Sequence, residues 1–173
     1  MKYPLILLLS LSLSACISNK SKTLDRADDD LPNTDLYDPL ESEVSSAEEN
    51  YQAALDFLNG YIESIDQLEI LEYVNNSPLA SENLKKALED IVIRAWEEHP
   101  RIGLDFDPLF DAQDYPAEGV ELQHFNPQTG YVTAKGIGWE DFRVVMKVIS
   151  DDGHILVDGC GAVNIPIDKR AER

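Results

Sequence analysis

Cysteine, positive charge and long apolar runs are all scarce in this 173-residue chain. Cys16 and Cys160 are its two cysteines, which excludes a fold held by several disulfides and a cysteine-rich zinc site. Lysine and arginine total 14 against 33 acidic residues, and the formal net charge is -19. A phosphate backbone would be repelled, so we exclude nucleic acid as a partner. The longest apolar run, Tyr3 to Leu13, is shorter than the ~20 residues that span a bilayer.

The local signatures of common active sites are also missing. The sequence has no Gly-x-Ser-x-Gly elbow and no His-Glu-x-x-His pair, and its glycines form no phosphate-binding loop before a helix. Cys160 ends an apolar stretch, where a small buried thiol is common. A thiolate site of Cys160 with His154 or His124 is the alternative. We therefore predict no cofactor and no resident metal, and we favour a non-enzymatic role.

The N-terminus has the layout of an export signal. Lys2 supplies a positive charge, the apolar run follows, and Leu13-Ser14-Ala15-Cys16 ends it. Leucine, two small residues and cysteine in this place resemble the lipobox of bacterial lipoproteins. The resemblance implies a signal peptide over residues 1–15, cleavage before Cys16, and lipidation of Cys16 on its sulfur and its new amino group. The alternative is an ordinary signal peptide in which Cys16 is incidental.

The same resemblance implies a location. Acyl chains on Cys16 would hold the protein to a membrane, since each buried CH₂ contributes ~0.8 kcal/mol. Ile17 stands where many Gram-negative lipoproteins retained at the inner membrane have aspartate. We therefore expect the bacterial cell envelope, at the periplasmic side of the outer membrane. Residues 16–47 are polar, acidic and without a sustained apolar period, which predicts a flexible tether after the lipidated cysteine.

Three amphipathic stretches predict helices. The first runs from Glu48 to about Ile65, with apolar residues at spacings of three and four, and a shorter one covers Gln67 to Val74. Ser81 caps a third helix from Glu82 to about Glu98, which ends before Pro100. The apolar stripe of this third helix is Leu84, Leu88, Ile91 and Ala95, widened by Ala87, Val92 and Trp96.

The C-terminal part alternates apolar and polar residues, as strands do. The predicted strands are Val120 to Phe125, Tyr131 to Lys135, Phe142 to Ile149 and Ile155 to Cys160. Helices followed by an antiparallel meander predict an α+β fold, with the N-terminal helices packed on a curved sheet of about four strands. We place this domain at residues 48–161 and a tail at residues 162–173, poorly ordered past Pro166.

An acidic connector at residues 100–119 joins the helices to the strands. Its interleaved aromatic residues predict a packed segment, and its four aspartates are the candidate binding residues: Asp105, Asp107, Asp111 and Asp114. Such carboxylates supply oxygen ligands for calcium, although their spacing is not that of an EF-hand. They serve equally as turn and cap residues. Acid–base chemistry in an apolar pocket would need a selected pair of carboxylates, and the spacing selects none.

Three stretches together resemble a known family. They are the first helix from Asn50 to Tyr61, the run Leu104-Asp105-Phe106-Asp107-Pro108 with Ala112-Gln113-Asp114 after it, and Asp152-Gly153 before Ile155-Leu156-Val157-Asp158-Gly159. The family consists of small exported bacterial proteins known as a domain of unknown function, and it covers residues 50–161. His154 departs from the Lys-Trp that relatives often place there. The resemblance implies a cone-shaped α+β roll similar to nuclear transport factor two, and it implies no catalytic residues.

We therefore predict a non-enzymatic lipoprotein whose domain binds a basic protein partner or a small ligand. An acidic domain favours a basic partner and speeds their encounter. An inhibitor or immunity role against a basic secreted toxin is one form of this function. The alternatives are a periplasmic hydrolase or isomerase that uses a pocket in the roll, and a calcium-stabilised structural module.

Overall fold

The computed structural model describes residues 39–172, in which three helices precede a four-stranded antiparallel sheet. This is the α+β fold that the sequence predicts. The predicted signal peptide, Cys16 and the tether up to residue 38 lie outside the described residues. Within the described part of the chain, no helix is both long enough and apolar enough to cross a membrane.

The helices are α1 (Pro39–Ser64), α2 (Ile70–Asn76) and α3 (Glu82–Glu98). Helix α1 begins at Pro39 rather than at the predicted Glu48, so the last part of the predicted tether is helical. Ser81 caps α3 as predicted, because its Oγ accepts the backbone N–H of Leu84 at 3.1 Å. The same hydroxyl donates to the Oδ1 atom of Asp158 at 2.7 Å, which ties the start of α3 to the last strand.

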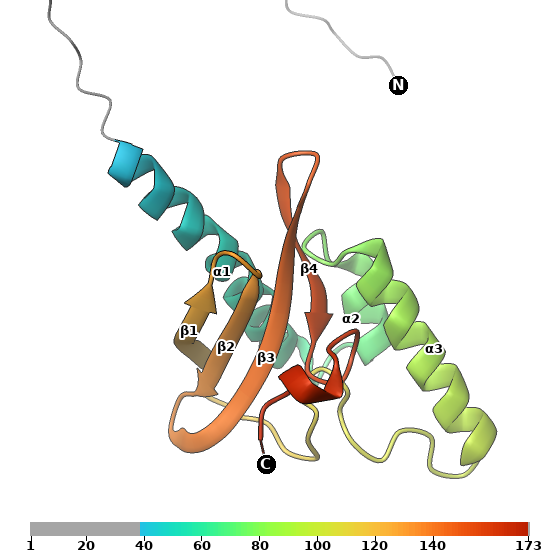
Figure 1. Cartoon of the computed structure of the whole chain (residues 1–173). Helices are drawn as coiled ribbons and strands as arrows, with labels where there is room; N and C mark the ends of the chain where they lie inside the picture. The colour runs from blue at the N-terminus through green and yellow to red at the C-terminus, as the bar shows by residue number, and fades with distance from the viewer. Residues whose placement is uncertain (1–38, 173) are drawn as a thin grey trace, which may run out of the picture. The chain divides into compact units, whose positions relative to one another are not determined.

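The strands β1 (Val120–Asn126), β2 (Tyr131–Gly136), β3 (Trp139–Asp151) and β4 (His154–Cys160) pair in chain order as a meander. Helix α1 contacts all four strands and α3 contacts β4. Figure 1 shows α1 crossing one face of the sheet, with the C-terminal segment on the opposite face. The helices thus cover one face of the sheet, which is where its apolar side chains must be buried.

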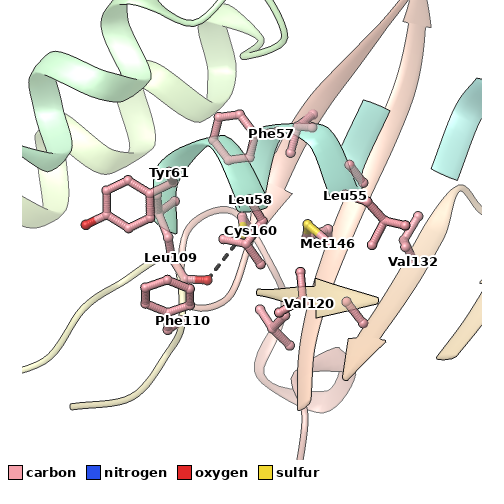
Figure 2. Packing of buried hydrophobic residues seen from close by; sticks show 14 of the residues in the cluster. Leu55, Phe57, Leu58, Tyr61, Leu109, Phe110, Val120, Val132, Met146 and Cys160 are labelled. Carbon is pink, nitrogen blue, oxygen red and sulfur yellow. Dashed lines mark hydrogen bonds between the residues drawn. The ribbon is translucent and has the colours of Figure 1, made fainter. Parts of the chain in front are cut away.

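The core lies between α1 and this face of the sheet. Helix α1 contributes Phe57 and Leu58, β3 contributes Met146, and the connector contributes Leu109 and Phe110, all of them fully buried (Figure 2). Burying one such side chain stabilises the fold by ~1.5–3 kcal/mol. The predicted alternation holds along β3, where the buried face carries Phe142, Val144, Met146 and Val148.

The C-terminal segment belongs to the fold, which differs from the predicted tail at residues 162–173. Val163 and Ile165 are 0% and 3% exposed. Past Pro166 the chain forms a short 3-10 helix, η1 (Ile167–Lys169), in place of the predicted loose end. The Arg170 guanidinium then donates to the backbone carbonyls of Ile165 and Ala162, at 3.0 and 2.9 Å. Val163, Ile165 and Arg170 therefore hold this segment against the rest of the domain, although its composition alone predicts a loose tail.

Candidate functional site

Asp107, one of the four candidate aspartates, holds the connector in a closed loop. Its backbone N–H donates to the carbonyl of Ala112 at 2.8 Å, and the reverse bond measures 3.4 Å. Its Oδ1 atom accepts the backbone N–H groups of Leu109 at 2.8 Å and Phe110 at 3.4 Å. Aspartate is favoured in such turns because its carboxylate satisfies the backbone a few residues further on. This turn directs the side chains of Leu109 and Phe110 into the core.

The second oxygen of Asp107 joins the connector to α1. Tyr61 donates its hydroxyl to the Oδ2 atom of Asp107 at 2.6 Å. Burial raises the pKa of Asp107, although the bonds from Tyr61 and from the two backbone N–H groups act in the opposite direction. Burial also raises the pKa of Tyr61, and the nearby Asp107 charge adds to the shift. The tyrosine therefore stays a hydrogen-bond donor at physiological pH.

Aromatic rings surround this hydrogen bond. The Tyr61 ring lies 5.2 Å from that of Tyr73 in α2 and 5.5 Å from that of Phe110, measured between centroids. Phe110 in turn stacks on Tyr115 at 5.4 Å. Tyr73 donates its hydroxyl to the backbone carbonyl of Phe57 at 2.5 Å, and burial raises the pKa of Tyr73 to about 12. These contacts fix α1, α2 and the connector against one another.

The other three candidate aspartates do not join Asp107. Asp105 and Asp114 are exposed. Asp111 has a φ of 55°, a left-handed conformation that aspartate tolerates, and its Oδ1 atom lies 4.0 Å from Arg170 Nη1. Among the described residues, no group of three or more His, Cys, Asp or Glu side chains could hold a metal ion. The structure therefore does not bring the four candidate aspartates together.

Cys160 lies in the core rather than in a reactive site. Its side chain is fully buried beneath α1, and the Sγ atom donates to the backbone carbonyl of Leu109 at 3.2 Å (Figure 2). Burial raises the pKa of the thiol, so it stays protonated. His124 and His154 are both exposed. The geometry therefore favours the buried-thiol interpretation over a nucleophilic cysteine.

A pocket of about 270 Å³ opens beside the Tyr61–Asp107 bond. Its walls combine the end of α1, the start of α2 and the connector, with Glu69, Ile70 and Leu104 on one side. These three residues also line a second pocket of about 370 Å³, which Trp96 of α3 and Ile102 complete. We call the two pockets together the α2–α3 groove.

The groove exposes large apolar side chains. Trp96 is 53% exposed and Ile102 is 67% exposed. The Trp96 indole packs on Gly103, where an added Cβ would lie 2.8 Å from the Trp96 ring and where φ is +65°. Glycine at this position therefore lets the connector pass beneath the ring and holds the indole at the mouth of the groove.

The sequence periodicity predicts that Trp96 belongs to the apolar stripe that α3 buries. This prediction is wrong, because the Trp96 side chain is exposed. The fully buried residues of α3 are Leu84 and Leu88, both in its first half. The second half runs past the edge of the sheet (Figure 1). A helical stripe shows which residues share a face, but it cannot show where the supporting layer stops. The groove is therefore a feature that the sequence analysis missed.

Comparison with known proteins gives one structural likeness. No protein-family model matches the chain, and no curated protein matches it. The crystal structure of a protein of unknown function from Bacteroides thetaiotaomicron VPI-5482 aligns with a TM-score of 0.45 and 18% sequence identity. The alignment covers 68% of this chain and 92% of the other. A likeness at this level carries no inference about activity.

Proposed function

We propose that the protein is an envelope-anchored lipoprotein whose domain binds a partner through the α2–α3 groove and catalyses no reaction. The observation that carries this proposal is the pair of exposed apolar residues, Trp96 and Ile102, at the mouth of a preformed groove. Exposed apolar surface continuous with a groove marks interaction sites. Tryptophan is also among the residues that contribute most to binding at interfaces.

The chemistry of the connector supports a binding role over a catalytic one. The carboxylate of Asp107 already accepts three hydrogen bonds, from Tyr61, Leu109 and Phe110. Both of its oxygens therefore already stabilise the connector and its contact with α1. The thiol of Cys160 is buried. Neither group is free to act as a base or nucleophile without breaking the contacts that close the connector.

One observation favours an enzymatic alternative, a hydrolase or isomerase. Asp107 lines the 270 Å³ pocket, and burial raises the pKa of its carboxyl, as general acid–base catalysis often requires. Panels of ester, amide and glycoside substrates would be assayed with the wild-type chain, Asp107→Asn and Asp111→Asn. Turnover that disappears in Asp107→Asn and survives in Asp111→Asn would favour the enzyme. No turnover on any substrate is the result that binding predicts.

The anchoring part of the proposal rests on the lipobox. Lipidated Cys16 would hold the chain at the periplasmic side of the outer membrane, and the residues before α1 would serve as the tether. The helix-then-meander order of the domain agrees with the proposed roll similar to nuclear transport factor two. Cys16→Ser should move the chain from the envelope fraction to the soluble periplasm. Continued sedimentation of this variant with envelopes would contradict the lipid anchor.

Site-specific photo-crosslinking tests the binding surface. A benzophenone amino acid would replace Ile102 at the groove, or Ile167 as a control, in the full-length chain expressed in cells. Ile167 is 83% exposed and belongs to the C-terminal segment on the other face of the sheet (Figure 1). We expect a discrete protein adduct from position 102 and none from position 167. Adducts of equal yield from both positions, or none from position 102, would contradict the proposal.

A further inference from the structure

The charged side chains that line the α2–α3 groove itself are acidic. The charged side chains that line its two pockets are Glu69 and Asp107, with no Lys, Arg or His among them. Ile102 also lines a neighbouring depression, together with Glu98, His99 and Arg101. The pocket between α2 and α3 is therefore mainly apolar, and Glu69 lies where it meets the more polar pocket beside Asp107.

Only one of these two carboxylates is available to a ligand. Asp107 is occupied by Tyr61 and by its own turn. Glu69 is exposed, precedes α2 as its N-cap residue and makes no side-chain cap bond. In the part of the chain that the structure describes, the ion pairs involve Lys85, Lys135, Lys169 and Arg170, and none includes Glu69. A free acceptor thus stands beside Ile70 and Leu104, at the junction of the two pockets.

We propose that the groove receives a basic amphipathic segment of a partner protein, a deepening that rests on the proposed function. Apolar side chains of the segment would contact Trp96, Ile102 and Leu104, and a lysine or arginine one helical turn away would pair with Glu69. Amphipathic helices are recognised in apolar grooves through anchors at such spacings. Charge complementarity supports this occupant, because a chain of net charge -19 attracts a cationic segment and accelerates its encounter.

The same charge argues against a membrane surface as the occupant. Anionic headgroups would be repelled by the domain. The groove is also a pair of hollows, one between α1, α2 and the connector and one between α2, α3 and the connector, which suits side chains entering from a partner. We therefore assign the groove to protein, and vesicle binding becomes an outcome of the test.

Trp96 itself can report occupancy of the groove. The chain has two tryptophans, so Trp139→Phe leaves Trp96 as the single indole. The full-length chain in detergent would be titrated with an amphipathic helical peptide of leucine and lysine, about 18 residues long to favour helix formation. A peptide of the same pattern with glutamate in place of lysine is the comparison. We expect a saturable blue shift of Trp96 emission with the lysine peptide and none with the glutamate peptide.

Two charge-removing variants separate specific pairing from general attraction. Glu69→Gln should weaken binding of the lysine peptide by up to about fivefold, as the loss of one exposed ion pair implies. Glu140→Gln removes the same charge from an exposed position at the start of β3. Screening limits the reach of a surface charge to about 8 Å at physiological salt, so this control should leave the affinity unchanged. Equal weakening by both variants would overturn the proposal.

The remaining outcomes separate this inference from the proposed function. A blue shift with the glutamate peptide would overturn the basic segment while leaving the groove as a binding site. A shift with anionic vesicles and with neither peptide would overturn it in favour of a membrane. No shift with any probe would also overturn the proposal of a basic segment. The photo-crosslinking result at position 102 would then be the test of the proposed function.

Discussion

The sharpest structural prediction concerns Asp107→Ala. This change removes the acceptor of three hydrogen bonds, leaving the Tyr61 hydroxyl and the N–H groups of Leu109 and Phe110 without their partner. Hydrogen bonds to a charged group contribute ~1.5–3 kcal/mol each, and losses within one network are not additive. We therefore expect the free energy of unfolding to fall by about 3–5 kcal/mol. In a domain of this size the melting temperature would fall by roughly 10 °C or more.

Asp107→Asn isolates the charge from the hydrogen bonds. Asparagine keeps an oxygen for the two backbone N–H groups, so we expect a much smaller loss than with alanine. Burial raises the folded-state pKa of Asp107, so its proton is held more tightly in the folded state than in the unfolded state. That proton stabilises the fold at pH below the unfolded value of about 4, and the contribution is lost as pH rises through the folded pKa. The stability of the wild type relative to Asp107→Asn should therefore fall over that interval.

Urea unfolding followed by circular dichroism, repeated at several pH values, measures both effects. Asp114→Ala is the matched control, because Asp114 is an exposed aspartate of the same connector. It should change the free energy of unfolding by less than about 0.5 kcal/mol. If Asp107→Ala were as stable as this control, Asp107 would not hold the connector. Its carboxylate would then be free for chemistry, and the argument against an enzyme would lose its main support.

Three further predictions concern other parts of the fold. The Cys160 thiol should not react with Ellman's reagent in the native chain and should react on unfolding, since burial raises its pKa and blocks access; rapid native reaction would contradict the packing. Gly103→Ala should cost about 1–3 kcal/mol, because it strains a positive φ and displaces Trp96, and a shift of indole emission would report the displacement. Ile165→Ala should cost about 2–4 kcal/mol if the C-terminal segment is part of the core, whereas a loose tail would show no change in urea unfolding.

Much of the fold follows from periodicity. The alternation along β3 predicts a strand, and the apolar stripe of α3 with its Ser81 cap predicts a helix. Each pattern can be recognised because it marks the face of the element that packs against its neighbours. The predicted start of α1 is nine residues too late, because residues 39–47 are mostly polar and propensity alone is a weak signal for a helix. The sequence does not predict that the C-terminal segment packs into the fold, because its two buried residues, Val163 and Ile165, belong to no regular helix or strand.

The site was less accessible to sequence reasoning. The aspartate pattern singled out Asp107, but its partner Tyr61 is 46 residues away and no spacing rule joins them. The exposure of Trp96 depends on where the sheet ends beneath α3, which is a property of the packed layers. The free state of Glu69 depends likewise on which cations the fold brings near it. Such facts arise only after the elements are assembled.

The proposed binding site of this protein is the α2–α3 groove. The most direct measurement compares the yield of the protein adduct at position 102 in the wild-type background and in Trp96→Ala. Truncating a central aromatic anchor costs at least about 2 kcal/mol of binding, so the adduct yield at limiting partner should fall by roughly 30-fold. A yield that Trp96→Ala leaves unchanged would contradict the proposed binding site, because the contact at position 102 would then not depend on the groove.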